Sequence, residues 1–149
     1  VSNISIMKFD SAIWGPSFWF VLHSISFKYP QFPSNALKKK YYDFIQNLPQ
    51  FIPDEKIGNE FAKFLDKYPV TPYLDNRNSF IRWMHFIHNR INVYLKKDIL
   101  PFSDFLKKYE KIYSQDNLTQ TRNKLIKKYI VYLITVIFLI ITSYLLYRK

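Results

Sequence analysis

The sequence predicts an all-α protein, a four-helix bundle with a short fifth helix, followed by one C-terminal transmembrane helix. Three observations favour this class. Apolar residues recur at helical spacing in five segments of residues 7–113. Prolines and helix-capping residues stand between these segments. The chain of 149 residues has only two glycines, Gly15 and Gly58, whereas a Rossmann unit or a β-sandwich needs more for its turns and phosphate loops.

The first two helices are expected between Pro16 and Leu48. Pro16 suits the first turn of a helix that runs to about Tyr29. Ser34 follows Pro33 and is a favourable N-cap for the second helix. The residues expected to face the core are Trp19, Leu22, His23 and Phe27 in the first helix, and Leu37, Tyr41, Phe44, Ile45 and Leu48 in the second.

Three further helices are expected before residue 113. Asp54 follows Pro53 and is a natural N-cap for the third. The fourth is expected at about residues 78–96, and Ser103 is expected to cap the short fifth. The inward residues are expected to be Ile57, Phe61, Phe64 and Leu65, then Phe80, Trp83, Met84, Ile87, Ile91 and Leu95, and last Phe105, Leu106, Tyr109 and Ile112.

Residues 129–147 form a run of 19 residues without a charge or a proline, which is long enough to cross a hydrocarbon layer as a helix. Lysine and arginine flank both ends, and Tyr129, Tyr144 and Tyr147 are aromatic residues of the kind found at membrane interfaces. A buried core helix is the alternative, but such a helix is rarely apolar on all faces. We therefore expect a helical domain at residues 7–113, a polar linker at 114–128 and a membrane anchor at 129–147.

The two ends of the sequence bear on targeting. Residues 1–6 are too short for the apolar core of a signal peptide and carry no basic residue. Only two residues follow the apolar run, as in tail-anchored chains, which usually keep the preceding domain in the cytosol. Both flanks are basic, so the positive-inside rule leaves the orientation open.

Charge and cysteine content limit the chemistry. The formal net charge of +11 fits an anionic partner, such as nucleic acid, lipid headgroups or a phosphorylated ligand. The lysines are scattered, however, and the single run at 38–40 fits the wet face of a helix. The chain contains no cysteine, which excludes disulfides, thiolate chemistry and cysteine-based zinc sites within it. Aromatic residues make up 19% of the chain, enough for stacking surfaces that suit planar ligands.

Two segments are more specific than a generic helical pattern. Residues 14–23 read WGPSFWFVLH, and residues 88–97 read HNRINVYLKK. The patterns W-G-P-x-x-W-x-x-L-H and H-N-x-(V/I)-N-x-x-L-x-K, in this order and about 65 residues apart, resemble the two FAD-contacting signatures of the Erv/ALR family of sulfhydryl oxidases. The likeness extends from Ile13 to about Pro101, and the expected helices match that family's fold.

The resemblance implies that the first and fourth helices line a slot for FAD. In the family, the residues matching Trp19 and His23 lie against the flavin nucleotide. Histidine and asparagine side chains of the second motif contact the adenine and ribityl-phosphate portion, and a lysine lies near phosphate. Each motif also carries an i, i+4 pair, so two side chains of one helix face can meet one ligand. The residues implied to bind FAD are Gly15, Trp19, His23, His88, Asn89, Asn92 and Lys96.

Plainer interpretations of these residues remain. Trp19 and His23 could be an aromatic residue and a hydrogen-bonded histidine of the core. His85 and His88 are i, i+3 and could with His23 imitate a metal cluster, but no carboxylate accompanies them at ligand spacing. We therefore expect no metal site.

The sequence departs from the family at the catalytic dithiol. Family members carry C-x-x-C at the start of the third helix, after a proline, and here Asp54 and Ile57 occupy the two cysteine positions. A carboxylate does not cycle through a disulfide, and isoleucine has no redox function. Aspartate is nevertheless a good N-cap and isoleucine fills an inward position. No catalytic residue is therefore intact, and the fold is expected to survive the loss.

Three functions stay open. The chain could be a pseudo-oxidase that keeps the bundle and FAD for structural or partner-binding work. It could be a form, with altered cysteines, of an active oxidase that converts protein dithiols and oxygen to disulfides and hydrogen peroxide. It could also be a basic domain that binds a membrane surface or nucleic acid. Family members dimerise through their first helices, so a homodimer is implied, as is a protein thiol or disulfide partner.

The resemblance also suggests a source and a location. Short, membrane-associated members of this family occur in large DNA viruses, and a composition rich in Lys, Asn, Ile and Tyr is typical of AT-rich genomes. We therefore expect a single-pass protein of a virion or a host internal membrane, with the domain on the cytosolic side.

Overall fold

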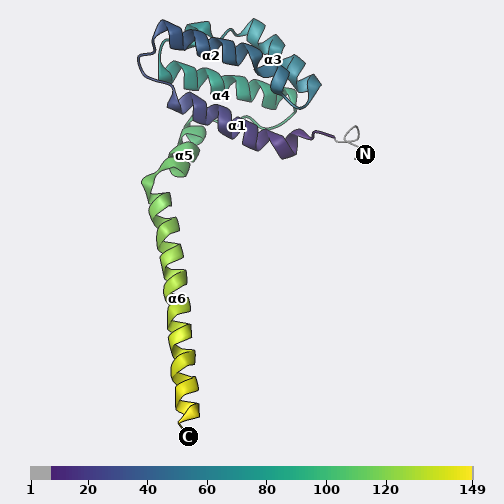
Figure 1. Cartoon of the computed structure of the whole chain (residues 1–149). Helices are drawn as coiled ribbons and strands as arrows, with labels where there is room; N and C mark the ends of the chain where they lie inside the picture. The colour runs from purple at the N-terminus through teal and green to yellow at the C-terminus, as the bar shows by residue number, and fades with distance from the viewer. Residues whose placement is uncertain (1–7, 149) are drawn as a thin grey trace. The chain divides into compact units, whose positions relative to one another are not determined.

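The computed structural model describes residues 8–148, and for residues 115–118 it describes the backbone only. The expectation for residues 1–6 and the first residue of the expected domain, Met7, lie outside this range. The described chain is all-α, with six α-helices and two short 3₁₀ helices (Figure 1). The elements are α1 (Ser11–Lys28), α2 (Asn35–Asn47), η2 (Leu48–Phe51), α3 (Glu55–Lys67), η3 (Thr71–Tyr73), α4 (Arg77–Tyr94), α5 (Phe102–Tyr113) and α6 (Gln115–Tyr147). The predicted fold class is confirmed.

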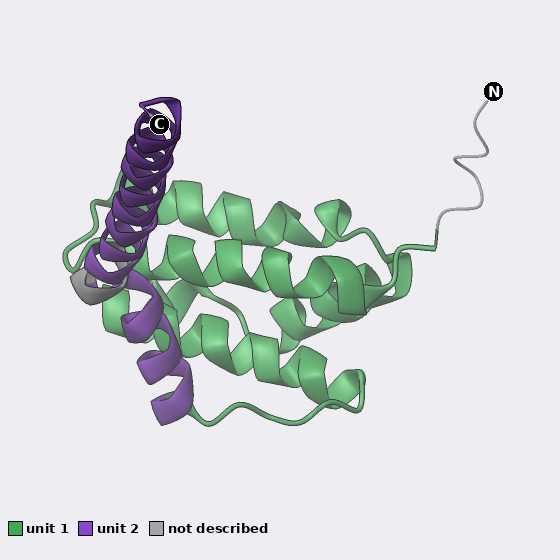
Figure 2. Cartoon of the chain, turned by 90° about the horizontal axis from the view of Figure 1, so that it is seen from below, with its two compact units in different colours: residues 1–102 green, residues 103–149 purple. Residues whose placement is uncertain are grey.

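Two compact units divide the chain, residues 1–102 and residues 103–149 (Figure 2). In the first unit, α4 lies alongside α1 and also packs against α3, while η2 joins α2 to α3 (Figure 1). The core of this unit consists of buried apolar side chains from all four helices and the loops between them: Leu22, Tyr29, Ile45, Leu48, Ile52, Ile57, Phe61, Leu65, Val70, Leu74, Phe80, Trp83, Met84, Ile87 and Ile91. α4 contributes five of them and is the central helix of the bundle.

Two helix starts agree with the caps expected from sequence. The side chain of Ser34 accepts a hydrogen bond from the backbone N–H of Leu37 at 3.3 Å. The side chain of Asp54 accepts one from the backbone N–H of Ile57 at 3.0 Å. Both side chains satisfy one of the amide groups that a helix start leaves without an intrahelical partner.

Two other starts were predicted wrongly. The first helix begins at Ser11 rather than Pro16, because Asp10 caps it by accepting from the Ala12 N–H at 2.8 Å. Pro16 therefore lies inside α1, where it withholds a donor from the carbonyl group four residues earlier. The last short helix begins at Phe102, so Ser103 is its second residue and not its N-cap.

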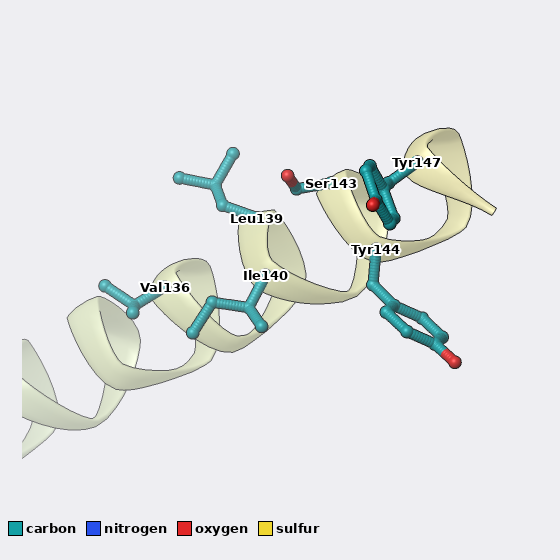
Figure 3. Close-up of a pocket in the computed structure, with 6 residues that line it drawn as sticks. All are labelled: Val136, Leu139, Ile140, Ser143, Tyr144 and Tyr147. Atoms are coloured by element: carbon teal, nitrogen blue, oxygen red, sulfur yellow. The ribbon is translucent and has the colours of Figure 1, made fainter.

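The second unit holds α5 and α6. α6 carries an apolar stretch that is long enough to cross a membrane, within Thr119–Tyr147, and none of it is buried in the protein. The helix is continuous from Gln115, so most of the stretch expected as a polar linker is itself helical and runs directly into the apolar part. Figure 3 shows six side chains near the C-terminal end of α6 that lie along a shallow surface hollow: Val136, Leu139, Ile140, Ser143, Tyr144 and Tyr147. A long, apolar, exposed helix of this kind is consistent with a membrane anchor.

Candidate functional site

The two sequence motifs meet at a cluster of three rings. The indole ring of Trp19 on α1 stacks on the imidazole ring of His88 on α4, with ring centroids 4.0 Å apart and planes 9° from parallel. Nε2 of His23 lies 2.8 Å from Nδ1 of His88, so one ring donates a hydrogen bond and the other accepts it. The ring of Phe61 on α3 lies 6.3 Å from Trp19. The motifs, 65 residues apart, thus form one site.

The local sequence explains why these rings converge. Trp19 and His23 are four residues apart on α1 and therefore share the face that meets α4. His23 is 1% exposed, and a buried imidazole needs a hydrogen-bond partner, which His88 provides. Trp19 and His88 are each partly exposed, so the stacked pair is an accessible planar surface at the edge of a buried polar contact.

Asn89 is held by a neighbouring loop. Its side-chain Nδ2 donates to the backbone carbonyl of Leu100 at 2.9 Å, and its Oδ1 accepts from the Leu100 N–H at 3.0 Å. Nε2 of His85 lies 2.7 Å from the same carbonyl oxygen. Asn89 and His85 therefore fasten the segment that follows α4, and the predicted contact of Asn89 with FAD stays a prediction.

Two features of the surroundings of His85 act on its pKa in opposite directions. Burial lowers the pKa of His85 below its ordinary value of 6.5, although the hydrogen bond to the Leu100 carbonyl acts in the opposite direction. The ring also makes an edge contact with Phe102, at 5.1 Å between centroids. His85 thus has a different set of partners from the pair formed by His23 and His88. Among the residues that the structure describes, no group of three or more side chains could hold a metal ion.

The end of α4 places the remaining motif residues. Lys96 adopts a left-handed backbone conformation, with φ at 56°, which ends the helix. The next N–H, that of Lys97, donates to the carbonyl group of Asn92 at 2.8 Å. The pattern counted from His88 puts its lysine at Lys97, so the assignment of that role to Lys96 needs correction by one residue. Both cations stand at the C-terminal end of α4, one turn beyond Asn92.

Asp54 and Ile57, at the positions where the resemblance implies a dithiol, have structural roles. Asp54 caps α3, and Ile57 is 5% exposed in the core. A carboxylate that accepts the Ile57 N–H supplies the cap that a cysteine would supply poorly. The replacements therefore stabilise the start of α3 and offer no sulfur.

The residues of the cluster fit a flavin nucleotide by their chemistry. The stacked rings offer a planar apolar surface, the imidazole and amide groups offer hydrogen bonds, and two lysines could meet phosphate. Gly15 adds room, since a Cβ atom built there would meet no other atom within 4 Å. The centroid distance of 4.0 Å leaves no space for a third ring between Trp19 and His88, so a flavin would contact the accessible side of the pair.

Sequence reasoning missed two features near the site. It did not foresee that the amide group of Asn89 would be occupied by a backbone segment eleven residues further along the chain. It also passed over Arg90, whose guanidinium carbon lies 5.7 and 5.8 Å from the ring centroids of Phe64 and Tyr68. The buried Nε of Arg90 has no hydrogen-bond partner within the described part of the chain. The position of Arg90 in its helix did not predict these ring contacts, because Phe64 and Tyr68 belong to another part of the chain and meet Arg90 only through tertiary packing.

Comparison with protein families identifies the same region. A model described as "Erv1 / Alr family" matches residues 16–113. The probable FAD-linked sulfhydryl oxidase R368 of Acanthamoeba polyphaga mimivirus is 31% identical over 99 residues, which cover 66% of this chain and 69% of that protein. The FAD-linked sulfhydryl oxidase ERV2 of Saccharomyces cerevisiae is 30% identical over 64% of this chain, but this match spans only 48% of that protein. An African swine fever virus FAD-linked sulfhydryl oxidase is 30% identical over 65% of this chain and 80% of its own length.

Solved structures share the fold. The core of yeast Erv1 superposes with a TM-score of 0.64 and 23% sequence identity, covering 76% of this chain and 96% of that one. The FAD-binding domain of Erv1 from Saccharomyces cerevisiae gives the same TM-score at 24% identity, over 72% of this chain and all of that one.

Proposed function

The chain belongs to the Erv1 / Alr family, whose members bind FAD, and from this premise we propose that it is a membrane-anchored flavin-binding protein that has lost dithiol oxidation. The observation that carries the proposal is the ring cluster of Trp19, His23 and His88 in a chain without cysteine. Residues of the two segments that resemble the family's flavin motifs lie together, and the chain has no cysteine through which a dithiol could pass its electrons.

The binding half of the proposal is supported by how tightly the cluster is defined. A buried histidine hydrogen-bonded to a second histidine, which in turn stacks on an indole ring, is costly to keep unless the polar atoms are used. The two lysines at the end of α4 could pair with the phosphates of a dinucleotide. FAD, when bound, would supply a two-electron acceptor. The chain's own residues would bind and orient it: Trp19 and His88 by stacking, and Asn92 and Lys97 at its polar end.

The lost-activity half depends on residues 54 and 57. Dithiol oxidation requires a thiolate that attacks and a second thiol that resolves the mixed disulfide. Asp54 and Ile57 provide neither, and both are used by the fold, as a helix cap and as a core side chain. We therefore propose structural or partner-binding work for the flavin-loaded bundle. An active oxidase with altered cysteines is the alternative, and it predicts that Asp54→Cys with Ile57→Cys restores thiol oxidation.

An outer face of α1 supports the homodimer implied by the family. Apolar side chains stand exposed along this helix, among them Ile13 at 78%, Val21 at 53% and Phe20 at 40%. Apolar side chains gathered on one helix are typical of a surface that is covered in an assembly. A second copy of this chain is the proposed occupant.

The apolar part of α6 supports the proposed anchor. Four cations, Arg122, Lys124, Lys127 and Lys128, lie directly before it. Arg148 and Lys149 follow the apolar run, so the positive-inside rule leaves its orientation open, and the cytosolic placement of the bundle is a proposal. The membrane of a virion or an internal membrane of the host cell is the proposed location, in keeping with the viral relatives.

The absorption spectrum of the full chain, purified in a mild detergent, tests the proposal. We expect a flavin band with near-stoichiometric FAD, and no hydrogen peroxide when a dithiol is added. His88→Leu should release the flavin, because it removes both the stacking partner of Trp19 and the hydrogen-bond partner of His23. Phe32→Leu is the matched control, since Phe32 is 91% exposed and outside the cluster, and it should keep the band. A folded wild-type chain that stays colourless with added FAD would disprove the binding half, and peroxide production would disprove the other.

A further inference from the structure

The polar first part of α6 carries a cluster of cations that no acidic residue offsets. Arg122, Lys124, Lys127 and Lys128 fall within seven residues, and the sequence has no aspartate or glutamate after Asp116. All four side chains are exposed. None of the salt bridges of the described residues involves them, because these join Lys38 to Asp75, Lys39 to Asp43 and Lys63 to Glu60. The cluster is therefore available to an anionic partner outside the chain.

Helix continuity fixes the depth of these cations relative to the apolar segment. α6 has no break between Gln115 and Tyr147. The 19 apolar residues from Tyr129 on rise about 28 Å, close to the roughly 30 Å of a bilayer's hydrocarbon core. Lys124 to Lys128 then occupy about the next 6 Å, which is the depth of one headgroup layer. If the apolar segment crosses a bilayer, the lysines must stand among the phosphates.

The arrangement of side chains around the helix agrees with this depth. Lys124, Lys127 and Lys128 are related by i, i+3 and i, i+4 steps and share one face. Leu125 and Ile126 lie on other faces, about half exposed, and can contact acyl chains where the helix enters the bilayer. The ammonium group of Lys128 lies 5.7 Å from the ring centroid of Tyr132, so this lysine extends toward the apolar segment. A lysine in that position reaches a headgroup phosphate from the edge of the hydrocarbon.

We propose that residues Arg122–Lys128 form a binding surface for anionic phospholipid headgroups of the leaflet that α6 enters from its N-terminal side. The inference rests on the proposed membrane anchor. The inference goes beyond the anchor because it names a lipid class, whereas an apolar helix without flanking cations would associate equally with any lipid of suitable chain length. The surface would hold the anchored chain preferentially in membrane regions rich in acidic lipid.

The test uses the full chain reconstituted in phosphatidylcholine vesicles with a trace of spin-labelled lipid. The motionally restricted fraction of the probe gives the relative association of phosphatidylserine and phosphatidylcholine with the protein. We expect phosphatidylserine to be preferred on the order of fivefold, since each cation near an anionic surface contributes about 1 kcal/mol. The preference should fall steeply when the salt concentration rises from about 0.1 M to about 1 M, because ions in the hydrated headgroup layer screen the attraction between the cations and the anionic lipid.

A charge-matched pair of variants separates this surface from net charge. The variant R122Q/K124Q/K127Q/K128Q should show almost no preference between the two lipids. The control K8Q/K28Q/K40Q/K56Q removes four exposed lysines from the first unit and should keep the preference. Equal association of the two lipids with the wild-type chain, or an equal loss in both variants, would overturn the inference. Carbonate extraction is done first: release of the chain from the vesicles would overturn the anchor as well, whereas retention with equal association would overturn the lipid surface alone.

Discussion

The two glycines of the chain predict opposite effects of one and the same substitution. Both lie in helices, Gly15 in α1 and Gly58 in α3, and alanine is the better helix former by about 1 kcal/mol. Their surroundings differ. A Cβ atom at Gly58 would lie 2.7 Å from the backbone carbonyl oxygen of Pro49, whereas at Gly15 it would meet nothing within 4 Å. The same added methyl group is therefore tolerated in one helix and not in the other.

The stability cost of a Cβ atom at Gly58 depends on the atom with which it would clash, the Pro49 carbonyl oxygen. Pro49 belongs to η2, where its carbonyl group also accepts the Ile52 N–H, so the oxygen cannot turn aside as a side chain could. Moving α3 away from η2 would loosen the core around Ile52, which lies 3.7 Å from the same Cβ position. Overpacking costs about 1–3 kcal/mol, and a clash with a backbone atom belongs to the upper part of this range, so the cost exceeds the gain of about 1 kcal/mol in helix propensity. We expect Gly58→Ala to lower the free energy of unfolding by about 1–2 kcal/mol and Gly15→Ala to raise it by up to about 1 kcal/mol.

Tryptophan fluorescence during urea denaturation in mild detergent measures the effect. All three tryptophans, Trp14, Trp19 and Trp83, lie in the first unit, so the signal reports unfolding of the bundle and not of the apolar helix. At a slope of about 1–3 kcal/mol per M of urea, a change of about 1 kcal/mol moves the urea midpoint by roughly 0.3–1 M, which the assay resolves. A Gly58→Ala protein as stable as the wild type would refute the close approach of α3 and η2, and a Gly15→Ala protein that is strongly destabilised would refute the open space beside α1.

Two more predictions concern the segment after α4. Asn89→Leu should lower the free energy of unfolding by about 1–3 kcal/mol and speed amide hydrogen exchange at Leu100, because the Leu100 N–H and carbonyl group both lose a partner. Asn89→Asp keeps the acceptor and should lose less stability. Unchanged amide exchange at Leu100 in Asn89→Leu would contradict the hydrogen bonds between Asn89 and Leu100. Burial lowers the pKa of His85, so the unfolded chain binds a proton more readily than the folded one. The free energy of unfolding should therefore fall as the pH drops below about 6.5 and through the pKa of His85 in the folded chain. His85→Gln should make this pH dependence shallower. Urea titrations at several pH values measure both effects, and an equal slope in the variant would show that His85 is not the cause.

The helices were predictable because their signals are local. Ser34 and Asp54 act as N-caps through bonds to an amide three residues away, and an apolar stripe such as that of α4 depends only on spacing. The errors came where two local signals competed. Pro16 suits a first turn, but Asp10 caps the helix earlier, and a proline near a helix start can be accommodated.

The site was predictable in part, for a different reason. The pairing of His23 with His88 joins residues 65 apart, and only the two motifs taken together pointed to it. The engagement of Asn89 by Leu100 could not be predicted, since it depends on the path of an irregular segment whose backbone donors and acceptors carry no sequence signature. The polar start of α6 was expected as a linker because its residues lack a periodic apolar face. A helix can nevertheless extend through such a stretch when the adjoining apolar segment is itself helical, since propagation is far easier than nucleation.

The distribution of roles explains how oxidase chemistry could be lost while the bundle was kept. The proposed flavin site lies on α1 and α4, which form the most extensive contact of the bundle, so their faces are constrained by packing and would also be constrained by the ligand. The dithiol positions lie at the start of α3, where the fold requires only a cap and an apolar side chain. Asp54 and Ile57 meet both requirements, and aspartate is the better cap, so selection for stability alone would accept them. Residues that bind a cofactor between two packed helices are harder to replace than residues that react at a helix start. Under the proposed function, this chain would have lost the cysteine pair while the packing of α1 against α4 kept the rings of the proposed cofactor site in place.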